Sequence, residues 1–404
     1  MSKLTTEKLA GTAKAPQLTE LESTLPSSWY ISDEIFALER EHIFMREWIC
    51  VAREEELPHP GDYQVLEVYG ESILLLRNES GELRAFYNVC RHRGARLCAT
   101  ADEAEQLGED SNDRVPLKGG VVNGQRIICP YHAWSYDLDG QLLRAPHMTA
   151  EMGLDVSSVS LHYVGCESWG GFVFINLEPE YAPDFSKHID ATAERFKRYP
   201  LSEMRIARTI TYQVNANWKV LCENYNECYH CGPVHPELCR VVPAFREQGG
   251  AELDWERGIP HRDGANTFTF SGTSSREAFP GLNEDEQNNH KGDLIYPNLF
   301  LSFARDHVAA FVLHAQGPAA TQIDCHFLFA AHEMNKADFD PADAVDFWHL
   351  VNRQDWSICE RVQQGMAARV HKRGVFSPME DWNLDIRRYV TDRIGAHVPP
   401  QFGD

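Results

Sequence analysis

This sequence has no long hydrophobic run and a deficit of positive charge, and both features exclude classes of protein. No apolar stretch approaches the roughly 18 residues that a membrane-spanning helix requires, so we expect no membrane partner. The first residues contain no apolar signal core, which favours a cytoplasmic location. Lysine and arginine number 38 against 60 acidic residues, for a formal net charge of −22. Such an acidic chain is a poor partner for nucleic acid.

Two motifs that redox proteins often carry are also missing. The chain has no evident GxGxxG fingerprint in a strand–helix–strand context, so it lacks a recognisable dinucleotide site of its own. It also lacks the C-x4-C-x2-C spacing of plant-type ferredoxins. The 11 cysteines are an odd number in a long chain, which argues against a disulfide framework. Reduced thiols and metal ligands are the better interpretation of these cysteines.

The sequence does contain enough apolar material for a large core. Its 404 residues are 43% hydrophobic and 11% aromatic, which is compatible with two or three domains. Residues 1–45 begin polar and become helical near residues 33–40, and residues 46–160 are rich in short segments of strand pattern separated by turns. Strands are expected at 63–68, 72–77 and 83–87, with a hairpin over 134–143 around Asp139-Gly140.

Residues 161–404 change to longer strand patterns followed by a long final helix. We expect strands at 170–177, 267–270, 299–305, 307–313 and 323–330, and a helix at 189–199. Residues 249–291 are rich in glycine, serine, asparagine and charge, which predicts long loops near the mouth of a pocket. This order favours an α+β domain in which a curved antiparallel sheet closes over a helix.

The segment from Asn217 to His235, NWKVLCENYNECYHCGPVH, combines a helical pattern with potential metal ligands. Glu223, Glu227 and His230 are spaced i, i+4 and i+7, so one stripe of the expected helix carries all three. The Gly-Pro pair that follows is expected to stop the helix and to turn His235 back beside His230. Two imidazoles with carboxylates nearby predict a metal site.

A third ligand is available on the expected final helix. Residues 348–366 present an apolar stripe at i+3 and i+4 spacing, and Asp355 is the one charge on that stripe. A buried carboxylate must be paired or bound to a metal, so the alternative is an ion pair with a buried arginine. Together with His230 and His235, Asp355 matches the two-histidine, one-carboxylate pattern of non-haem iron sites.

Two more pairs of ligands lie in the β-rich region. Cys90 and His92 share one short stretch, and Cys129 and His132 share another. Each pair offers one thiolate and one imidazole, which suits a two-iron cluster with two cysteines on one iron and two histidines on the other. The alternative is two unrelated loops. Gly94 stands where a tight cluster-binding loop needs a residue without a side chain.

These segments resemble those of a known family. CRHRG with CPYHAW resembles the Rieske 2Fe–2S signature, and NWKVLCENYNECYHCGPVH with RQDWSICERVQQG resembles the iron-binding segments of Rieske non-haem iron oxygenase α-subunits, the ring-hydroxylating oxygenase family. The resemblance implies an α+β chain with an all-β Rieske 2Fe–2S domain over 46–160 and a catalytic domain of the helix-grip type over 161–404. Residues 1–45 are expected to pack on the catalytic domain.

The resemblance assigns each candidate ligand to a metal. It implies that Cys90 and Cys129 bind one iron of the cluster, and that His92 and His132 bind the other. It also implies that a mononuclear Fe(II) is held by the remaining three candidates, which are His230, His235 and Asp355. Three protein ligands on one face leave the opposite positions open for O2 and water.

Glu227 acquires a role from the resemblance. In this family, a carboxylate at its position bridges an iron-ligating histidine to a cluster-ligating histidine of the neighbouring chain, which implies a path from His132 through Glu227 to His230. Transfer between chains implies a ring, commonly a homotrimer. Glu223 and Asn224 are candidates for supporting the ligands from outside. Because the chain has no dinucleotide site, a separate reductase using NAD(P)H is the expected partner.

The expected substrate is a small molecule. ENYNECYHC, with glutamate at the bridging position, resembles members that oxidise quaternary ammonium compounds such as glycine betaine, proline betaine, carnitine or choline, and the product loses formaldehyde. A cation requires an aromatic or acidic pocket. The alternative reaction is hydroxylation or dioxygenation of an aromatic ring. An electron carrier and a zinc-bound binding module are disfavoured because a second open iron site would serve neither. The aromatic pocket candidates are Phe268, Phe270, Tyr296, Phe300, Phe303 and Phe311.

One feature departs from the family pattern, and a group of cysteines needs its own interpretation. Thirty-six residues separate His92 from Cys129, and the excess, residues 101–120, holds six acidic and two basic residues. We interpret it as a solvated surface insertion, with a subunit contact or a docking surface for the electron donor as the alternative. Four cysteines crowd the iron-binding segment without the spacing of a ferredoxin, and we interpret Cys222, Cys228, Cys231 and Cys239 as buried thiols.

Overall fold

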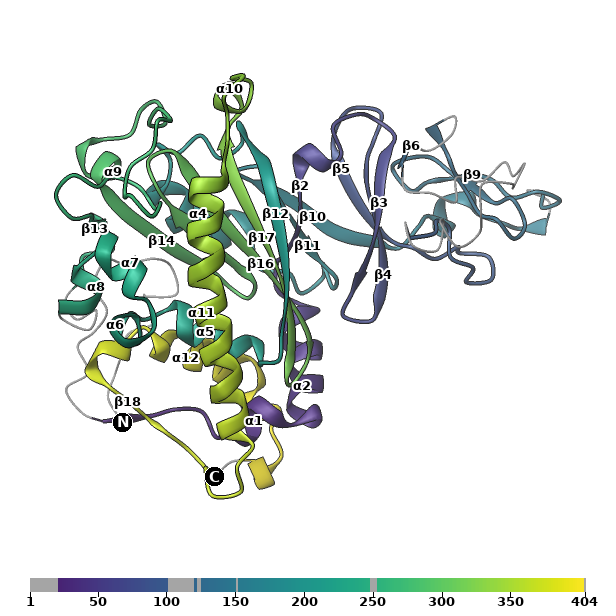
Figure 1. Cartoon of the computed structure of the whole chain (residues 1–404). Coiled ribbons are helices and arrows are strands. Elements are labelled where there is room, and N and C mark those ends of the chain that lie inside the picture. The colour runs from purple at the N-terminus through teal and green to yellow at the C-terminus, as the bar shows by residue number, and fades with distance from the viewer. Residues whose placement is uncertain (1–20, 101–119, 122–124, 150–151, 248–252, 403–404) are drawn as a thin grey trace. The chain divides into compact units, whose positions relative to one another are not determined.

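The computed structural model describes residues 21–100, 120–121, 125–149, 152–247 and 253–402 (Figure 1). The chain divides into two compact units: a first unit, Met45–Ala182, and a second unit that combines Met1–Phe44 with Pro183–Asp404. The first unit extends past the expected boundary at residue 160 because two further strands join its sheet. The predicted acidic insertion lies outside the described residues, apart from its last residue, Gly120.

The first unit is built on a seven-stranded antiparallel sheet. Its strand order is β2-β11-β10-β5-β4-β3-β6, so the late strands β10 and β11 lie between β2 and β5. The predicted strands 63–68, 72–77 and 83–87 are all present. The bounds are β2 (Ile49–Arg53), β3 (Asp62–Val68), β4 (Glu71–Arg77), β5 (Leu83–Tyr87), β6 (Gly120–Val121), β10 (Tyr163–Trp169) and β11 (Phe172–Asn176).

A smaller three-stranded sheet completes the first unit. Strands β7 (Ile127–Ile128), β8 (Ser135–Tyr136) and β9 (Leu142–Arg144) pair in that order, which confirms the hairpin expected around Asp139-Gly140. Gly140 has a φ of 81°, and a Cβ there would lie 2.6 Å from the Phe86 ring, so both the backbone and the packing require glycine. This contact fixes the small sheet against β5.

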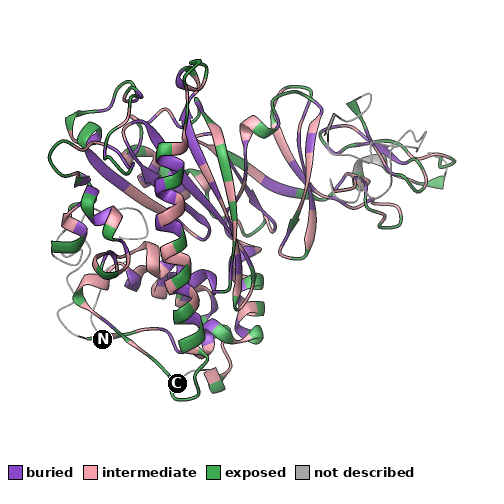
Figure 2. Cartoon of the chain, viewed as in Figure 1, coloured by how far each residue is buried: buried purple, intermediate pink, exposed green. Residues whose placement is uncertain are grey.

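The second unit contains a six-stranded antiparallel sheet curled around helices. Its order is β12-β17-β16-β15-β14-β13, and β15 and the first part of β16 are fully buried (Figure 2). This arrangement confirms the predicted α+β domain with a curved sheet. The bounds are β12 (Met204–Val214), β13 (Ile259–Pro260), β14 (Asn289–Ile295), β15 (Leu299–Phe303), β16 (His307–Gly317) and β17 (Ala320–Ala330).

Helix α11 (Ala342–Met366) runs across one face of this sheet (Figure 1). Asn352 bonds Cys325 on β17, and Trp356 packs edge-on to Tyr212 on β12. No helix among the described residues is long and apolar enough to cross a membrane. The remaining helices are α1 (Ser28–Ile31), α2 (Asp33–Glu39), α4 (Phe185–Arg195), α5 (Trp218–Tyr225), α6 (Cys231–Val234), α7 (Pro236–Val241), α8 (Ala244–Glu247), α9 (Glu284–Asn288), α10 (Ala331–Met334) and α12 (Asn383–Ile394).

Two sequence predictions fail in this unit outside the metal-binding segment. Helix α4 begins at Phe185, four residues before the expected start, because Asp184 caps its first turn by accepting from Ser186 N. Residues 267–270 are not a strand. Their backbone folds on itself through bonds from Thr267 N to Gly272 O and from Gly272 N to Thr269 O.

The N-terminal segment packs within the second unit. Strand β1 (Glu22–Ser23) pairs with β18 (Val375–Phe376), and Trp29 Nε1 donates to Phe402 O at 2.9 Å. Glu39 of α2 reaches α5, where it pairs with Lys219 and accepts from Trp218 Nε1 at 2.8 Å. Residues 21–44 therefore brace the helix that leads to the candidate metal site.

Candidate iron centre and cluster site

Helix α5 leads to the segment that carries the two candidate histidine ligands. The Asn217 side chain caps its start by accepting from Lys219 N at 3.0 Å. The helix ends at Tyr225, so the prediction that it continues through His230 is wrong. The i, i+4, i+7 pattern continues past that end, but the chain leaves the helix at Asn226 and Glu227 adopts a non-helical conformation.

Glu227 organises the break that follows α5. Its Oε2 accepts from His230 N at 3.1 Å and its Oε1 lies 2.6 Å from His230 Nδ1. Helix α6 then begins at Cys231 and contains Pro233, so the proline does not stop a helix as predicted. It lies in the first turn of α6, where a missing N–H costs no hydrogen bond. Helix α6, which is four residues long and flanked by the two histidines, brings His235 back beside His230.

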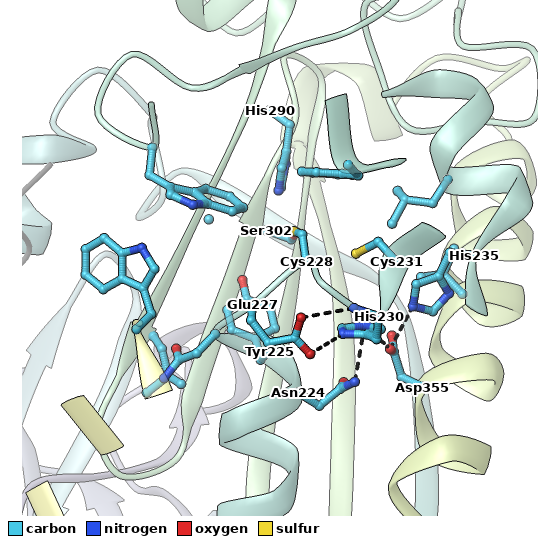
Figure 3. A pocket seen from close by; sticks show the side chains of 18 of the residues that line it. Asn224, Tyr225, Glu227, Cys228, His230, Cys231, His235, His290, Ser302 and Asp355 are labelled. Atoms are coloured by element: carbon cyan, nitrogen blue, oxygen red, sulfur yellow. Dashed lines mark hydrogen bonds and ion pairs between the residues drawn. The ribbon is translucent and has the colours of Figure 1, made fainter. Parts of the chain in front are cut away.

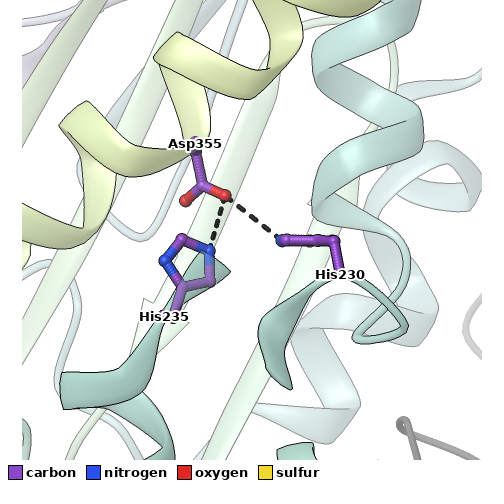
Figure 4. A group of neighbouring side chains, drawn as sticks. All are labelled: His230, His235 and Asp355. Atoms are coloured by element: carbon purple, nitrogen blue, oxygen red, sulfur yellow. Dashed lines mark hydrogen bonds and ion pairs between the residues drawn. The ribbon is translucent and has the colours of Figure 1, made fainter. Parts of the chain in front are cut away.

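The structure brings His230, His235 and Asp355 together (Figure 4). Asp355 Oδ1 lies 2.8 Å from His235 Nε2 and 3.2 Å from His230 Nε2. The candidate ligand atoms of the three residues all lie within 4.8 Å of one another. The alternative prediction, an ion pair between Asp355 and a buried arginine, is wrong, since both ion-pair partners of Asp355 among the described residues are histidines. Two imidazoles and one carboxylate converging in this way could hold Fe(II).

The outer nitrogens of both histidines have partners of their own. Glu227 binds Nδ1 of His230, and Gln354 Oε1 lies 2.8 Å from Nδ1 of His235. Each Nδ1–H therefore donates outward, which leaves each Nε2 lone pair directed at the shared centre. Asn224 Nδ2 lies 3.2 Å from His230 Nε2, so Asn224 contacts the site.

The charges of the centre reinforce one another. Burial alone raises the pKa of Asp355, yet His235 and His230 beside it hold the pKa well below its usual range. Burial lowers the pKa of His230, but hydrogen bonds with Asp355 and Glu227 outweigh burial and raise it to about 11. Asp355 is therefore held as a carboxylate anion, which is the charge state that a metal ligand requires.

Glu223 takes a different position from the one expected. Its Oε1 accepts from Tyr30 on α1 at 2.5 Å, and its described hydrogen bond does not reach the histidines. Burial raises the pKa of Glu223 to about 7. The residue therefore joins the N-terminal segment to α5 and supports the centre only through the helix.

A pocket of about 150 Å³ opens onto the centre (Figure 3). Glu227, His230 and Asp355 lie close together on its wall, and Cys228 and Cys231 also face it. All eleven cysteines are free of disulfides, and the four near this segment are buried, as predicted. Of the six aromatic pocket candidates, only Phe268 lines the pocket. The other aromatic and imidazole residues on its wall are Tyr225, Phe245, Trp255, His290, Trp348 and Trp382.

Trp348 is held in place by a buried chain of hydrogen bonds, which we did not predict from the sequence. Its Nε1 donates to His307 Nε2 at 3.1 Å, and His307 Nδ1 lies 2.9 Å from Asp306 Oδ1. The acceptor role of Nε2 places the His307 proton on Nδ1. The signal available in the sequence was the Asp306-His307 pair at the start of a strongly apolar strand, where two polar side chains need buried partners.

The second set of candidate ligands lies in the first unit, on two loops of the same design. Cys90 N donates to Ala95 O and Gly94 N donates back to Cys90 O, at 2.8 and 3.0 Å. The other loop repeats the pattern around Cys129, at 2.8 and 3.1 Å. In each loop the fourth residue after the cysteine has a positive φ, 75° at Gly94 and 57° at Ala133. This repeat rules against two unrelated loops.

The side chains of these loops fit a two-iron cluster. The rings of His92 and His132 lie 4.7 Å apart between centroids, and both Nδ1 atoms are buried and have no hydrogen-bond partner among the described residues. Two unpartnered imidazole nitrogens beside two buried thiols are the donor set of a Rieske cluster. Tyr136 OH lies 3.4 Å from Cys90 Sγ, in reach of a cysteine ligand.

Two stretches of the chain match models of protein families. Residues 47–160 match the model of the Rieske [2Fe-2S] domain. Residues 201–396 match the model described as the ring hydroxylating alpha subunit, catalytic domain. The two matches cover both candidate metal sites.

Curated relatives match across most of the chain. It is 28% identical to the glycine betaine monooxygenase oxygenase subunit of Chromohalobacter salexigens, over 93% of this chain and 88% of that protein. It is 29% identical to the carnitine monooxygenase oxygenase subunit of Acinetobacter baumannii, over 86% of each chain. Among solved structures, the quaternary ammonium Rieske monooxygenase CntA with L-carnitine has a TM-score of 0.68 at 25% identity, covering 97% of this chain and 100% of that one.

Proposed function

This chain belongs to the Rieske non-haem iron oxygenase α-subunits, and from that membership we propose that it oxidises an N-methyl group of a quaternary ammonium compound. Glycine betaine, proline betaine and carnitine are the proposed substrates. The observation that carries the proposal is an aromatic pocket at the candidate iron triad, with Glu227 adding negative charge to its wall. Aromatic faces and carboxylates together attract a cation that has no hydrogen to donate.

The proposed reaction uses one O2 and two electrons. One oxygen atom enters a C–H bond of an N-methyl group and the other leaves as water with two protons. The N-hydroxymethyl product then breaks its C–N bond to release formaldehyde and a tertiary amine. Fe(II), held by His230, His235 and Asp355, would supply O2 activation. The protein's own residues orient the methyl group and exclude water from the pocket.

We assign Glu227 to electron delivery. Its carboxylate binds His230 Nδ1 at 2.6 Å, and its side chain is 9% exposed, so this unit does not enclose it completely. A carboxylate that accepts from two imidazoles fixes both rings and joins two metal sites. The proposed path runs from His132 of one chain to Glu227 and His230 of the next, in a homotrimer.

The remaining partners follow from the chemistry. Electrons reach the cluster from a separate NAD(P)H-dependent reductase, since the chain has no dinucleotide fingerprint. Eleven free cysteines are consistent with a reducing compartment, and we propose the cytoplasm.

A substrate panel tests this function. The purified protein, loaded with both metal centres and supplied with a surrogate reductase and NADH, is given quaternary ammonium compounds and aromatic hydrocarbons. We expect formaldehyde release and matching O2 consumption with the former. A cis-diol or phenol from an aromatic compound, without formaldehyde from any ammonium compound, would replace this proposal with the aromatic ring hydroxylase.

A further inference from the structure

Arg195 is a basic residue on the wall of the pocket that the proposed reaction does not use. It is the last residue of α4, and its side chain is 10% exposed. Among the described residues that line the pocket, it is the one arginine, and no lysine joins it. An arginine removed from water in this way needs partners for its hydrogen-bond donors.

The guanidinium of Arg195 is held by a hydrogen bond, but some of its N–H donors have no acceptor among the described residues. It carries five N–H donors. One nitrogen, Nη2, donates to Trp255 O, and Nη1 lies 3.6 Å from Asp293 Oδ1, which is beyond hydrogen-bond distance. Its Nε is buried and has no hydrogen-bond partner in the described part of the chain. Arg195 therefore keeps donors available for a further acceptor.

Asp293 does not complete the coordination of Arg195. Its Oδ2 accepts from Thr192 Oγ1 at 2.8 Å and its Oδ1 accepts from Leu294 N at 3.0 Å. Arg198, close by in sequence, makes a closed pair with Glu286 through two bonds of 2.6 and 2.8 Å. Among the described residues, Arg195 has no such two-bond pair with a carboxylate, which argues that it does more than stabilise the fold through an ion pair.

A continuous series of rings connects Arg195 to the helix that carries Asp355. Trp255, whose carbonyl holds Arg195, packs 6.0 Å from His290 between ring centroids. His290 packs 4.7 Å from Phe268, and Phe268 packs 5.0 Å from Trp348 on α11. Trp348 and Asp355 are seven residues apart, which is about two helical turns. The pocket thus runs from a cationic side chain along an aromatic wall to the carboxylate end at the triad.

We propose that Arg195 is a specificity-determining anchor for a carboxylate on the substrate. The inference rests on the proposed function and narrows it: the pocket selects a zwitterion, with the ammonium group along the aromatic wall and the carboxylate at Arg195. Planar guanidinium donors match the two oxygens of a carboxylate. A substrate with an alcohol in place of the carboxylate leaves a buried charge without its partner, and such a site discriminates strongly.

Glycine betaine and choline provide the test, because they share a trimethylammonium group and differ in carboxylate against alcohol. Formaldehyde release is measured with the metal-loaded protein and reductase for the natural chain, Arg195→Gln and Arg195→Lys, with carnitine as a second carboxylated substrate. We expect Arg195→Gln to raise KM for the carboxylated substrates by roughly 10- to 100-fold, as the loss of a charge-assisted hydrogen bond predicts. Its KM for choline should change less than about threefold, and Arg195→Lys should fall between.

Arg198→Gln is the matched control, since it removes an arginine of the same region that does not line the pocket. The Rieske absorbance and the melting temperature of each variant report folding. If Arg195→Gln does not fold, the KM of Arg195→Lys for the carboxylated substrates tests the anchor instead, because lysine keeps the charge. Unchanged KM for both carboxylated substrates in a folded variant, or equal KM for glycine betaine and choline in the natural chain, overturns the anchor and leaves N-demethylation standing.

The failure of the proposed function has a different signature. In that case no ammonium compound releases formaldehyde from any variant. The anchor is then decided by calorimetric titration of the metal-loaded protein with glycine betaine and with benzoate. Carboxylate binding that is lost in Arg195→Gln and retained in Arg198→Gln supports the anchor, and binding that is equal in both, or absent from the natural chain, overturns it.

Discussion

Glu227 constrains His230 at two atoms, the backbone N–H and the ring Nδ1. The first bond closes the turn after α5 and the second sets which ring nitrogen carries the proton. A substitution that keeps the first bond and removes the negative charge therefore separates folding from electron delivery.

We predict that Glu227→Gln keeps cluster and iron contents near normal and nearly abolishes turnover, by roughly 100-fold or more. Glutamine can still accept from the backbone N–H, but it carries no charge to stabilise the imidazole proton. Metal analysis and coupled O2 uptake provide the measurement. Glu227→Asp, which keeps the carboxylate, should retain part of the activity. Steady-state coupling equal to that of the natural chain in Glu227→Gln would remove Glu227 from the electron path.

Asp355→Ala is expected to lose the mononuclear iron while the cluster spectrum is unchanged, because two histidines alone bind Fe(II) weakly. Iron-to-cluster ratio by metal analysis and visible absorption checks this. Asp346→Ala, an exposed aspartate on the same helix, is the matched control. Full iron occupancy in Asp355→Ala would mean that another carboxylate completes the site.

The sequence could predict these side chains because each stands in a pattern that is typical of metal ligands. Asp355 was the one charge on an apolar helical stripe, and His230 and His235 flanked a helix break. Arg195 and Trp255 could not be predicted, since each is a single residue in an ordinary segment. Their role depends on the folded chain, in which α4 and the loop that carries Trp255 line the same pocket.

At the scale of elements, α5 depends on a buried ion pair. Lys219 and Glu39 have fully buried side chains, and Glu39 also accepts from Trp218. Removing one partner leaves the other charge buried and uncompensated.

We predict that Glu39→Ala lowers the free energy of unfolding of this unit by roughly 3–5 kcal/mol. Chemical denaturation followed by tryptophan fluorescence measures the change. The double variant Glu39→Leu with Lys219→Met should be more stable than Glu39→Ala, and the exposed Glu34→Gln should be close to the natural chain. Equal stability of Glu39→Ala and the natural chain would show that Lys219 finds another partner.

The contact between α1 and α5 gives stability a pH dependence. Burial raises the pKa of Glu223 from about 4.5 to about 7, so the folded chain binds this proton more tightly than the unfolded chain. The stability from this proton is complete below pH 4.5 and is lost as pH rises through about 7. We predict that Glu223→Gln, which can still accept from Tyr30, gains about 1–3 kcal/mol relative to the natural chain between pH 5 and 8. Parallel melting curves across this range would contradict the raised pKa.

The strands were predictable where alternation was local, as in β3, β4 and β5. The end of α5 was not predictable. The chain leaves the helix a few residues before His230, and His230 then contacts Asp355 on α11. Residues 267–270 carry a strand-like pattern, but Thr267 bonds Asp306 instead of a neighbouring strand. In both places, a contact distant in sequence decides the local conformation.

At the scale of the whole molecule, the two metal sites lie in different compact units of the chain. The Rieske loops belong to residues 45–182, and the triad belongs to the other unit. The proposed path between chains makes a prediction that no single-chain path shares.

We predict that co-expression of Cys129→Ser and Asp355→Ala chains restores turnover, although each variant alone is inactive. Each mixed trimer can pair an intact cluster with an intact iron site on the next chain, and random mixing gives about 25% of natural activity. O2-coupled product formation by the co-purified mixture is the measurement. Variants that are purified separately and then combined serve as the control. If trimers that are confirmed to contain both variants form no product, electron transfer takes place within one chain.

The second unit is discontinuous, and this has a consequence for synthesis. Its first segment is translated before residues 45–182, yet that segment pairs with Val375–Phe376 and bonds Phe402. The inserted unit has its own sheet and can fold while the ribosome is still adding residues. The opening helices must wait for partners that emerge hundreds of residues later. The segment that is made before residues 45–182 therefore completes its packing after them.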